Sequence, residues 1–139
     1  MTGTHEVALA NPTIPSLLYS ELEGEVREGV KNVLEKRTSW PAALERTEAD
    51  NTVDVDLWHA LAVEVGLAGL AAPESIGGGG ATWREVAVVL EELGRKSSAV
   101  PFLGHAVTAT ALLEKVRDRD LLGRAVAGDI TVEIGRAHV

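Results

Sequence analysis

The sequence predicts an all-α fold, a single helical bundle of about five helices that spans residues 16–132. Apolar residues recur at three- and four-residue spacing in several segments, which is the period of an amphipathic helix. The composition is 45% hydrophobic but only 4% aromatic, so the helices would pack through small and aliphatic side chains. At 139 residues, the chain is long enough for one domain with its own core.

The first helix is predicted from about Leu17 to Lys36, with Ser16 as its N-cap. Its apolar face consists of Leu18, Leu22, Val26, Val30, Val33 and Leu34. Proline disfavours helix at the residue before it, so Trp40–Pro41 ends this pattern. A short helical turn over residues 42–49 and a polar loop over residues 48–52 are expected to follow.

The middle of the sequence predicts a short helix and a glycine-rich loop. Asp54 or Asp56 would cap the helix, and Gly66 suits its end. The apolar segment 67–72 leaves three structures open: a buried strand, a buried extended connection or a single helical turn. Pro73–Gly80 ends in four consecutive glycines and is expected to form a tight loop with several positive φ angles.

The clearest helix signal begins at Thr82, because the Thr82 hydroxyl and the Glu85 carboxylate can form a capping box. This helix is expected to end at Gly94. Two further helices are predicted, over about residues 101–115 and residues 118–127, from their apolar spacing.

The charge balance and the residue types argue against several functions. The formal net charge is −8, and no basic patch is interleaved with aromatic residues, so nucleic acid is not expected as a partner. Cysteine is absent, and the four histidines lack metal-ligand spacing, so no metal site is predicted. No apolar stretch approaches the ~20 residues that cross a membrane. Since no secretory signal is visible either, we expect a cytoplasmic protein without a membrane span.

Two local features are candidates for chemistry. The glycines at residues 77–80 lead into a helix N-terminus, where backbone amides could cradle an anion. The Lys-Ser or Lys-Thr pair of a phosphate loop is missing, however, which favours a purely structural loop. Glu91 and Glu92 are adjacent and cannot face each other on a helix. One is expected to pair with another helix and the other to be solvated, so the residues alone assign no catalytic site.

Four segments follow one another in a specific order. They are Leu57–Leu70, which holds a Gly-Leu segment, Pro73–Gly80, Glu85–Gly94, which ends in Glu-Glu-Leu-Gly, and Leu121–Asp129. The second is similar to the Pro-Glu-x-x-Gly-Gly-x-Gly loop of the acyl-CoA dehydrogenase family. Together the four segments resemble the N-terminal helical domain of that family, and the resemblance covers about residues 16–132.

The resemblance implies a larger parent protein with a middle β-domain and a C-terminal helical domain. In such enzymes FAD lies mainly between the middle and C-terminal domains of neighbouring subunits. A Glu of the C-terminal domain removes the α-proton of an acyl-CoA thioester, and hydride passes to the flavin. We therefore expect acyl-CoA as the substrate, FAD in the parent and a homo- or hetero-oligomer. On this chain we expect no catalytic residue, no bound FAD and no activity.

The family's N-terminal domain supplies one wall of the acyl pocket. The matching residues here are Val100, Pro101, Phe102, Leu103, His105 and Ala106. Pro101–Phe102 also resembles a bacterial branch linked to sterol or branched side chains, in which some enzymes pair unlike subunits and one subunit lacks the catalytic Glu. The alternatives are therefore a non-catalytic partner subunit, a helical interaction module, or a related flavin monooxygenase or acyl-CoA oxidase.

The sequence also gives expectations for the two ends of the chain and for its apolar surface. Residues 1–15 are predicted to be a flexible arm, and residues 130–132 have the composition of a strand start. Residues 133–139 are expected to be a non-native tail, because the sequence from Ile134 resembles a translated sequencing adapter. Apolar faces are expected to stay partly uncovered at Val86, Leu90, Leu93, Val107 and Leu112.

Overall fold

The computed structural model describes residues 16–49 and 53–132, and in that part of the chain it is helical without a strand. The six α-helices are α1 (Glu21–Arg37), α2 (Trp40–Thr47), α3 (Val55–His59), α4 (Trp83–Arg95), α5 (Thr110–Val116) and α6 (Arg119–Ala127). Two π-helical segments, η1 (Ala60–Glu64) and η4 (Leu103–Ala109), continue α3 and lead into α5. Two 3₁₀ turns are η2 (Leu67–Gly69) and η3 (Glu74–Ile76). The predicted all-α bundle is confirmed.

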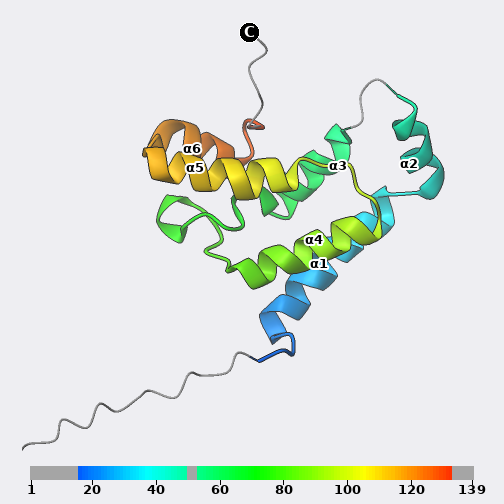
Figure 1. Cartoon of the computed structure of the whole chain (residues 1–139), viewed down its shortest axis with the longest axis horizontal. Coiled ribbons are helices and arrows are strands. Elements are labelled where there is room, and N and C mark those ends of the chain that lie inside the picture. The colour runs from blue at the N-terminus through cyan, green and yellow to red at the C-terminus, as the bar shows by residue number, and fades with distance from the viewer. Residues whose placement is uncertain (1–15, 50–52, 133–139) are drawn as a thin grey trace, which may run out of the picture.

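The helices form two packed groups that share one body (Figure 1). Helices α1 and α4 lie side by side, and α5 lies against α6. The main core fills the space between α1, α3, α4 and η4, where Leu34, Leu61 and Phe102 have almost no exposed surface. A smaller core joins α5 and α6 to Ala72. The loop between η2 and α4 therefore packs against the α5–α6 pair.

Helix α1 begins four residues later than its apolar pattern predicts. Ser20, not Ser16, is the N-cap, and it forms a capping box with Glu23. Leu17 and Leu18 precede the helix and are exposed. The predicted start at Leu17 is wrong because an apolar pattern does not by itself mark the first helical residue, whereas Glu three residues after Ser20 is the stronger signal.

Local capping residues account for the boundaries of several other helices. Thr82 and Glu85 form the predicted capping box of α4, which ends at Arg95, one residue past the predicted end. Asp54 caps α3, as one of the two predicted candidates, and Asp118 caps α6. Segment 67–72 adopts the third of its open alternatives, a single 3₁₀ turn.

Residues 130–132 do not form a strand, contrary to the pattern of their sequence. They lie against the helical body, where Trp58 and His105 hold them by hydrogen bonds. A strand needs a partner strand for its backbone groups, and the described residues offer none. The predicted arm (residues 1–15), most of the predicted loop at residues 48–52 and the predicted tail (residues 133–139) lie outside the described residues, so these expectations stay predictions.

Candidate functional site

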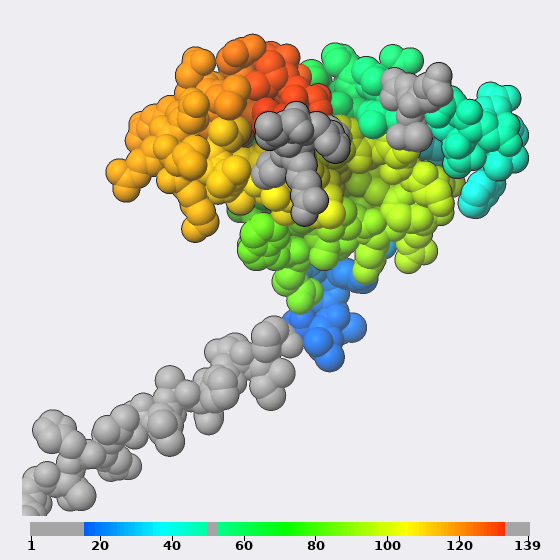
Figure 2. Space-filling model, turned by 45° about the horizontal axis from the view of Figure 1, so that its top comes forward, coloured from blue at the N-terminus to red at the C-terminus, as the bar shows by residue number. Residues whose placement is uncertain are grey.

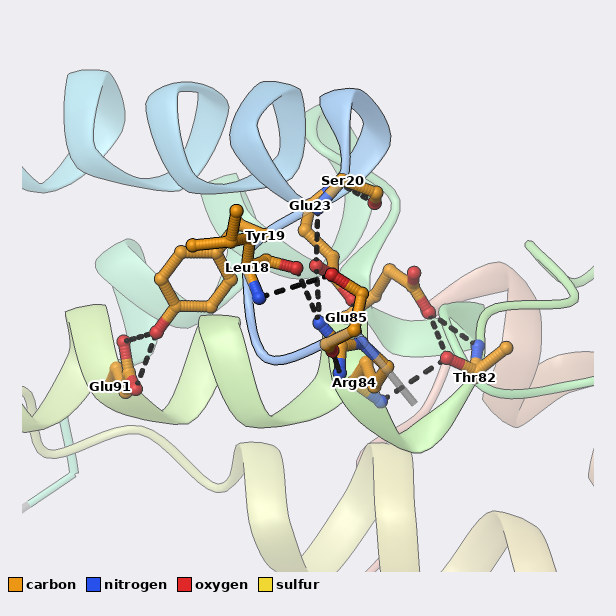
Figure 3. Close-up of polar contacts among 9 residues, drawn as sticks. Leu18, Tyr19, Ser20, Glu23, Thr82, Arg84, Glu85 and Glu91 are labelled. Atoms are coloured by element: carbon orange, nitrogen blue, oxygen red, sulfur yellow. Dashed lines mark hydrogen bonds and ion pairs between the residues drawn. The ribbon is translucent and has the colours of Figure 1, made fainter. Parts of the chain in front are cut away.

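A network of charged side chains joins α1 to α4 at the N-terminal end of the bundle (Figure 3). Arg84 donates to both carboxylate oxygens of Glu23, and its Nη2 lies 3.0 Å from Glu23 Oε2. The same guanidinium donates to the carbonyl oxygens of Ser16, at 3.0 Å, and of Leu18, at 3.1 Å. One arginine thus fixes the start of α1 and the residues before it. Figure 2 shows this N-terminal end of α1, in blue, projecting from the rest of the molecule.

Arg27 is the second link between these helices. Its two terminal nitrogens pair with Glu91 and with Glu92, and its guanidinium carbon lies 4.6 Å from the centre of the Tyr19 ring. The Tyr19 hydroxyl donates to Glu91. The expectation that only one of the two glutamates pairs with another helix was wrong, because the five-donor fork of one arginine reaches both.

The carboxylates of Glu23 and Glu91 are held ionised, which suits structural partners better than proton acceptors. The Arg84 guanidinium and the Ser20 backbone amide lower the pKa of Glu23 to about 2. Hydrogen bonds from Arg27 and Tyr19 lower the pKa of Glu91. A general base works best with a pKa near the operating pH, so the network gives no indication of acid–base chemistry.

The glycine loop has no backbone amides free for an anion. The amides of residues 77–81 all donate to carbonyl oxygens within the chain, including Gly79 to Gly69 and Gly80 to Ala72, each at 2.9 Å. Gly77 and Gly80 have the predicted positive φ angles, of 86° and 61°. The loop therefore fits neither the phosphates of a dinucleotide nor another anion.

The six residues of the predicted acyl-pocket wall differ in accessibility. Three are at most 1% exposed: Phe102, His105 and Ala106. Two are half-buried: Val100 and Pro101. Leu103 is 56% exposed and offers most of the surface that a ligand or another domain could touch. The assignment of this wall to acyl binding stays a prediction.

Exposed and half-buried apolar side chains lie on α4 and on the helical stretch from Leu103 to Val116, and one groove joins the Trp83 end of α4 to this stretch. The chain turns back between these segments (Figure 1), so the C-terminal end of α4 and the start of η4 lie toward the same side of the molecule. We define the apolar face as Trp83, Ala87, Leu90, Leu103, Val107 and Ala111. At its Trp83 end, a groove of about 200 Å³ is lined by Ala71, Ala81, Thr82, Trp83, Val107, Thr110, Ala111 and Glu114.

The uncovered apolar surface differs in part from the expectation. Leu90 and Leu112 are exposed, at 37% and 47%, and Val107 is half-buried. Val86 and Leu93 are instead buried in the main core. They lie on a different side of α4 from the stripe of Trp83, Ala87 and Leu90, because successive residues of an α-helix advance by about 100° around its axis.

The π-helical form of η4 is a feature that sequence reasoning missed. In this segment the Thr108 hydroxyl donates to the carbonyl of Leu103, at 2.9 Å, and the Thr110 hydroxyl donates to that of His105, at 3.0 Å. Both bonds span five residues. π-Helical turns often occur at functional sites. This one carries two residues of the apolar face, Leu103 and Val107.

A second groove, of about 460 Å³, lies between the 73–76 loop and the α5–α6 connection. Its charged side chains, Glu114, Arg117 and Arg119, are exposed. Among the described residues there is no group of three His, Cys, Asp or Glu side chains placed to hold a metal ion. No helix in the described ranges is long and apolar enough to cross a membrane.

In the part of the chain that the structure describes, the fold and surface define a helical domain that presents an apolar face and no catalytic constellation. Residues 20–118 match the family model described as acyl-CoA dehydrogenase, N-terminal domain. The chain therefore belongs to the acyl-CoA dehydrogenase family, as its four ordered segments predicted.

Curated relatives and solved structures agree with this assignment. Acyl-CoA dehydrogenase IpdE2 of Mycolicibacterium smegmatis is 38% identical over 102 residues, which are 73% of this chain and 33% of that protein. Acyl-CoA dehydrogenase FadE27 of Mycobacterium tuberculosis is 35% identical over 89 residues, 61% of this chain and 24% of that protein. The chain thus spans a third or less of the length of these curated relatives.

Two solved structures share the fold. The ChsE4-ChsE5 complex from Mycobacterium tuberculosis matches with a TM-score of 0.75 and 27% identity, over 86% of this chain and 34% of that chain. A variant of the Tcur3481-Tcur3483 steroid ACAD matches with a TM-score of 0.71 and 28% identity, over 81% of this chain and 32% of that chain.

Proposed function

We propose that this chain is the N-terminal domain of an FAD-dependent enzyme that oxidises an acyl-CoA thioester to the 2,3-enoyl-CoA. The family match over residues 20–118 carries the proposal. FAD, bound outside the described residues, would accept the hydride, and a Glu outside this chain would remove the α-proton. The carboxylates that join α1 to α4, those of Glu23, Glu91 and Glu92, are engaged with arginines, which fits a domain that shapes a pocket and leaves the proton transfer to another part of the enzyme.

Within that function, the apolar face is the contribution of this domain to the acyl pocket. Its exposed members, Trp83, Leu90 and Leu103, would otherwise leave large apolar side chains in water. The small residues Ala71, Ala81 and Ala111 line the adjoining groove and leave room for a bulky acyl group. The predicted wall is thereby narrowed to Leu103, with Val100 and Pro101 beside it, while Phe102, His105 and Ala106 support it from inside.

A steroid-derived acyl group is the substrate that the comparisons favour. One of the two solved structures is described as a steroid ACAD, and Pro101–Phe102 resembles the branch associated with sterol side chains. A rigid ring system has little conformational entropy to lose when it enters a pocket. The groove of about 200 Å³, which is lined partly by alanines, would form one side of a pocket for such a group.

A second candidate is a role as one of two unlike subunits. Both solved structures carry the names of two chains, ChsE4-ChsE5 and Tcur3481-Tcur3483, so the parent protein would pair with a different chain. This domain would then belong either to the catalytic subunit or to its non-catalytic partner. The relatedness to acyl-CoA dehydrogenases gives no comparable support for an isolated interaction module.

A hybrid enzyme tests the first proposal. Residues 20–118 of this chain would replace the matching residues of IpdE2 of Mycolicibacterium smegmatis, and anaerobic bleaching of FAD by acyl-CoA thioesters would be followed. The expected result is a hybrid that binds FAD and is reduced by thioesters that reduce unmodified IpdE2. An FAD-loaded hybrid that no such thioester reduces would count against the proposal.

The subunit question needs two further hybrids. The domain would be placed in ChsE4 and in ChsE5 in turn, each co-expressed with its natural partner. Assembly and activity in only one of the two arrangements would assign the domain to that kind of subunit. Equal behaviour in both arrangements would contradict a subunit-specific role.

A further inference from the structure

His105 is buried at the meeting point of three segments that are far apart in the sequence. It lies in η4 and has no exposed surface. The Trp58 ring of α3 meets the imidazole edge to face, with 5.3 Å between ring centres and an interplanar angle of 73°. Ala125 of α6 and Val132, past the end of α6, each form a hydrogen bond with one ring nitrogen. His105 is therefore out of reach of a ligand in this structure.

The two hydrogen bonds define the protonation state of the ring. The Val132 amide donates to Nδ1 at 3.0 Å, so Nδ1 must carry a lone pair and no proton. Nε2 lies 3.0 Å from the Ala125 carbonyl oxygen, which can only accept, so Nε2 carries the proton. The contacts fit only the neutral Nε2–H tautomer, since protonated histidine would set an N–H against the Val132 N–H.

The segment that follows α6 has a second attachment beside the first. The indole nitrogen of Trp58 donates to the Thr131 hydroxyl at 3.0 Å. Trp58 is itself nearly buried, at 6% exposure. Two aromatic side chains in edge-to-face contact, from α3 and from η4, thus each bind one of two successive residues. These contacts, and not strand pairing, determine the path of residues 131 and 132.

We propose that His105 is a pH-sensitive latch that fixes the path of the chain beyond α6 while its imidazole is neutral and releases it on protonation. The proposal does not depend on the reaction of the parent enzyme, because it concerns only contacts within this domain. It also gives the buried histidine a function other than the acyl-pocket wall, namely to position the last described residues of the helical domain.

Among the described residues, no charged side chain contacts the His105 ring to stabilise its protonated form. Burial lowers the pKa of His105, and the only opposing contribution is the hydrogen bond with the Ala125 carbonyl. The charged or titratable groups of the elements packed around it are exposed: Asp56, His59, Glu64, Glu114, Lys115, Arg119, Asp120, Arg124 and Asp129. Protonation is therefore coupled to opening of the latch, because only an opened ring gains water as a partner.

The size of the pH effect follows from the linkage between protonation of His105 and opening of the latch. An opening that exposes His105 at its ordinary pKa of 6.5 becomes about tenfold more favourable at pH 5.5 than at pH 7.5, because most of the opened form is protonated at the lower pH. Hydrogen exchange of the Val132 amide in the 139-residue chain reports this opening. After correction for intrinsic exchange, its protection should fall by about tenfold between these pH values.

Two substitutions test the roles of the two ring nitrogens of His105 separately. In His105→Asn the amide oxygen lies near the place of Nδ1, so the bond from Val132 is kept and the pH dependence should disappear. In His105→Gln the amide nitrogen lies near the place of Nε2, so the bond to Ala125 is kept and Val132 should lose about tenfold in protection at pH 7.5, the size expected for one hydrogen bond. His59→Gln, at an exposed histidine, is the control and should match the unsubstituted chain.

The ring itself can be measured without any substitution. A long-range ¹H–¹⁵N spectrum at pH 7.5 should show His105 as the Nε2–H tautomer. An Nδ1–H tautomer, or protection of Val132 that does not change with pH, would overturn the proposal. So would a folded His105→Gln chain in which Val132 is as protected as in the unsubstituted one.

Discussion

Arg84 of α4 and Glu23 of α1 form an ion pair in which the carboxylate is almost fully buried and the guanidinium side chain is 47% exposed. Glu23 also accepts from the Ser20 amide, so a single carboxylate takes part both in the capping box of α1 and in the contact between the two helices. The start of α1 therefore depends on α4, although 61 residues separate the two side chains.

Removing this arginine should destabilise the domain. In Arg84→Ala the buried Glu23 carboxylate loses its partner, and the residues before α1 lose the two contacts to their carbonyls. We expect a fall of several degrees in the melting temperature followed by circular dichroism, and a smaller fall for Arg84→Lys, which cannot form the two-point contact. Arg95→Ala is the control, because Arg95 is exposed and has one contact, to Glu92, at 3.4 Å. Equal melting of the two alanine variants would contradict this role.

The same pair should make stability depend on pH in the acid range. The pKa of Glu23 is lowered from 4.5 to about 2 in the folded chain, so its contribution is complete above about pH 4.5 and is lost as the pH falls toward 2. Urea unfolding at pH 7, 4 and 3 should show a shallower acid loss for Glu23→Gln than for the unsubstituted chain. Glu25→Gln, at an exposed position, should leave the slope unchanged, and an unchanged slope for Glu23→Gln would refute the assignment.

The glycine loop should tolerate no side chain at Gly78. A Cβ there would lie 2.2 Å from the Ala72 carbonyl oxygen, so Gly78→Ala must shift the loop and should cost about 1–3 kcal/mol in the free energy of unfolding. Gly29→Ala is the matched control, because a Cβ in that helix meets nothing within 4 Å. It should stabilise the domain by about 0.5–1 kcal/mol. Chemical denaturation measures both, and a neutral Gly78→Ala would show that the close approach is absent.

Adjacent residues of the predicted wall should behave in opposite ways. Phe102 is in the main core, so Phe102→Ala should lower the free energy of unfolding by about 3–5 kcal/mol. Leu103 is largely exposed, so Leu103→Ala should change it by less than about 0.5 kcal/mol. Similar losses for both variants would mean that the helix is rotated from the orientation described above.

The sequence predicted those features whose cause is local. The capping box at Thr82 and the cap at Asp54 are read from residues three positions apart. The capping box of α1 was equally visible in Ser20 and Glu23, and the helix start was misplaced only because the apolar pattern was extended to Leu18. Residue types within one short segment were enough for these features.

Features that depend on distant contacts were not predictable in the same way. The residues that flank Glu91 and Glu92 in the sequence do not indicate that Arg27 binds both. The burial of His105 depends on α3, α6 and the segment after α6 meeting at one point. The family resemblance pointed to the stretch of residues 100–106, but only the fold could show which of its side chains face outward.

The measurement that tests the central claim most directly is the kcat/KM of the IpdE2 hybrid for acyl-CoA with a tryptophan placed on the apolar face. Leu103→Trp should lower kcat/KM by about tenfold or more, because the added bulk would occupy acyl space. Leu44→Trp, at a similarly exposed leucine on α2, should leave it unchanged. Equal kcat/KM values for the two variants, both with full FAD content, would contradict the claim that this face forms part of the acyl pocket.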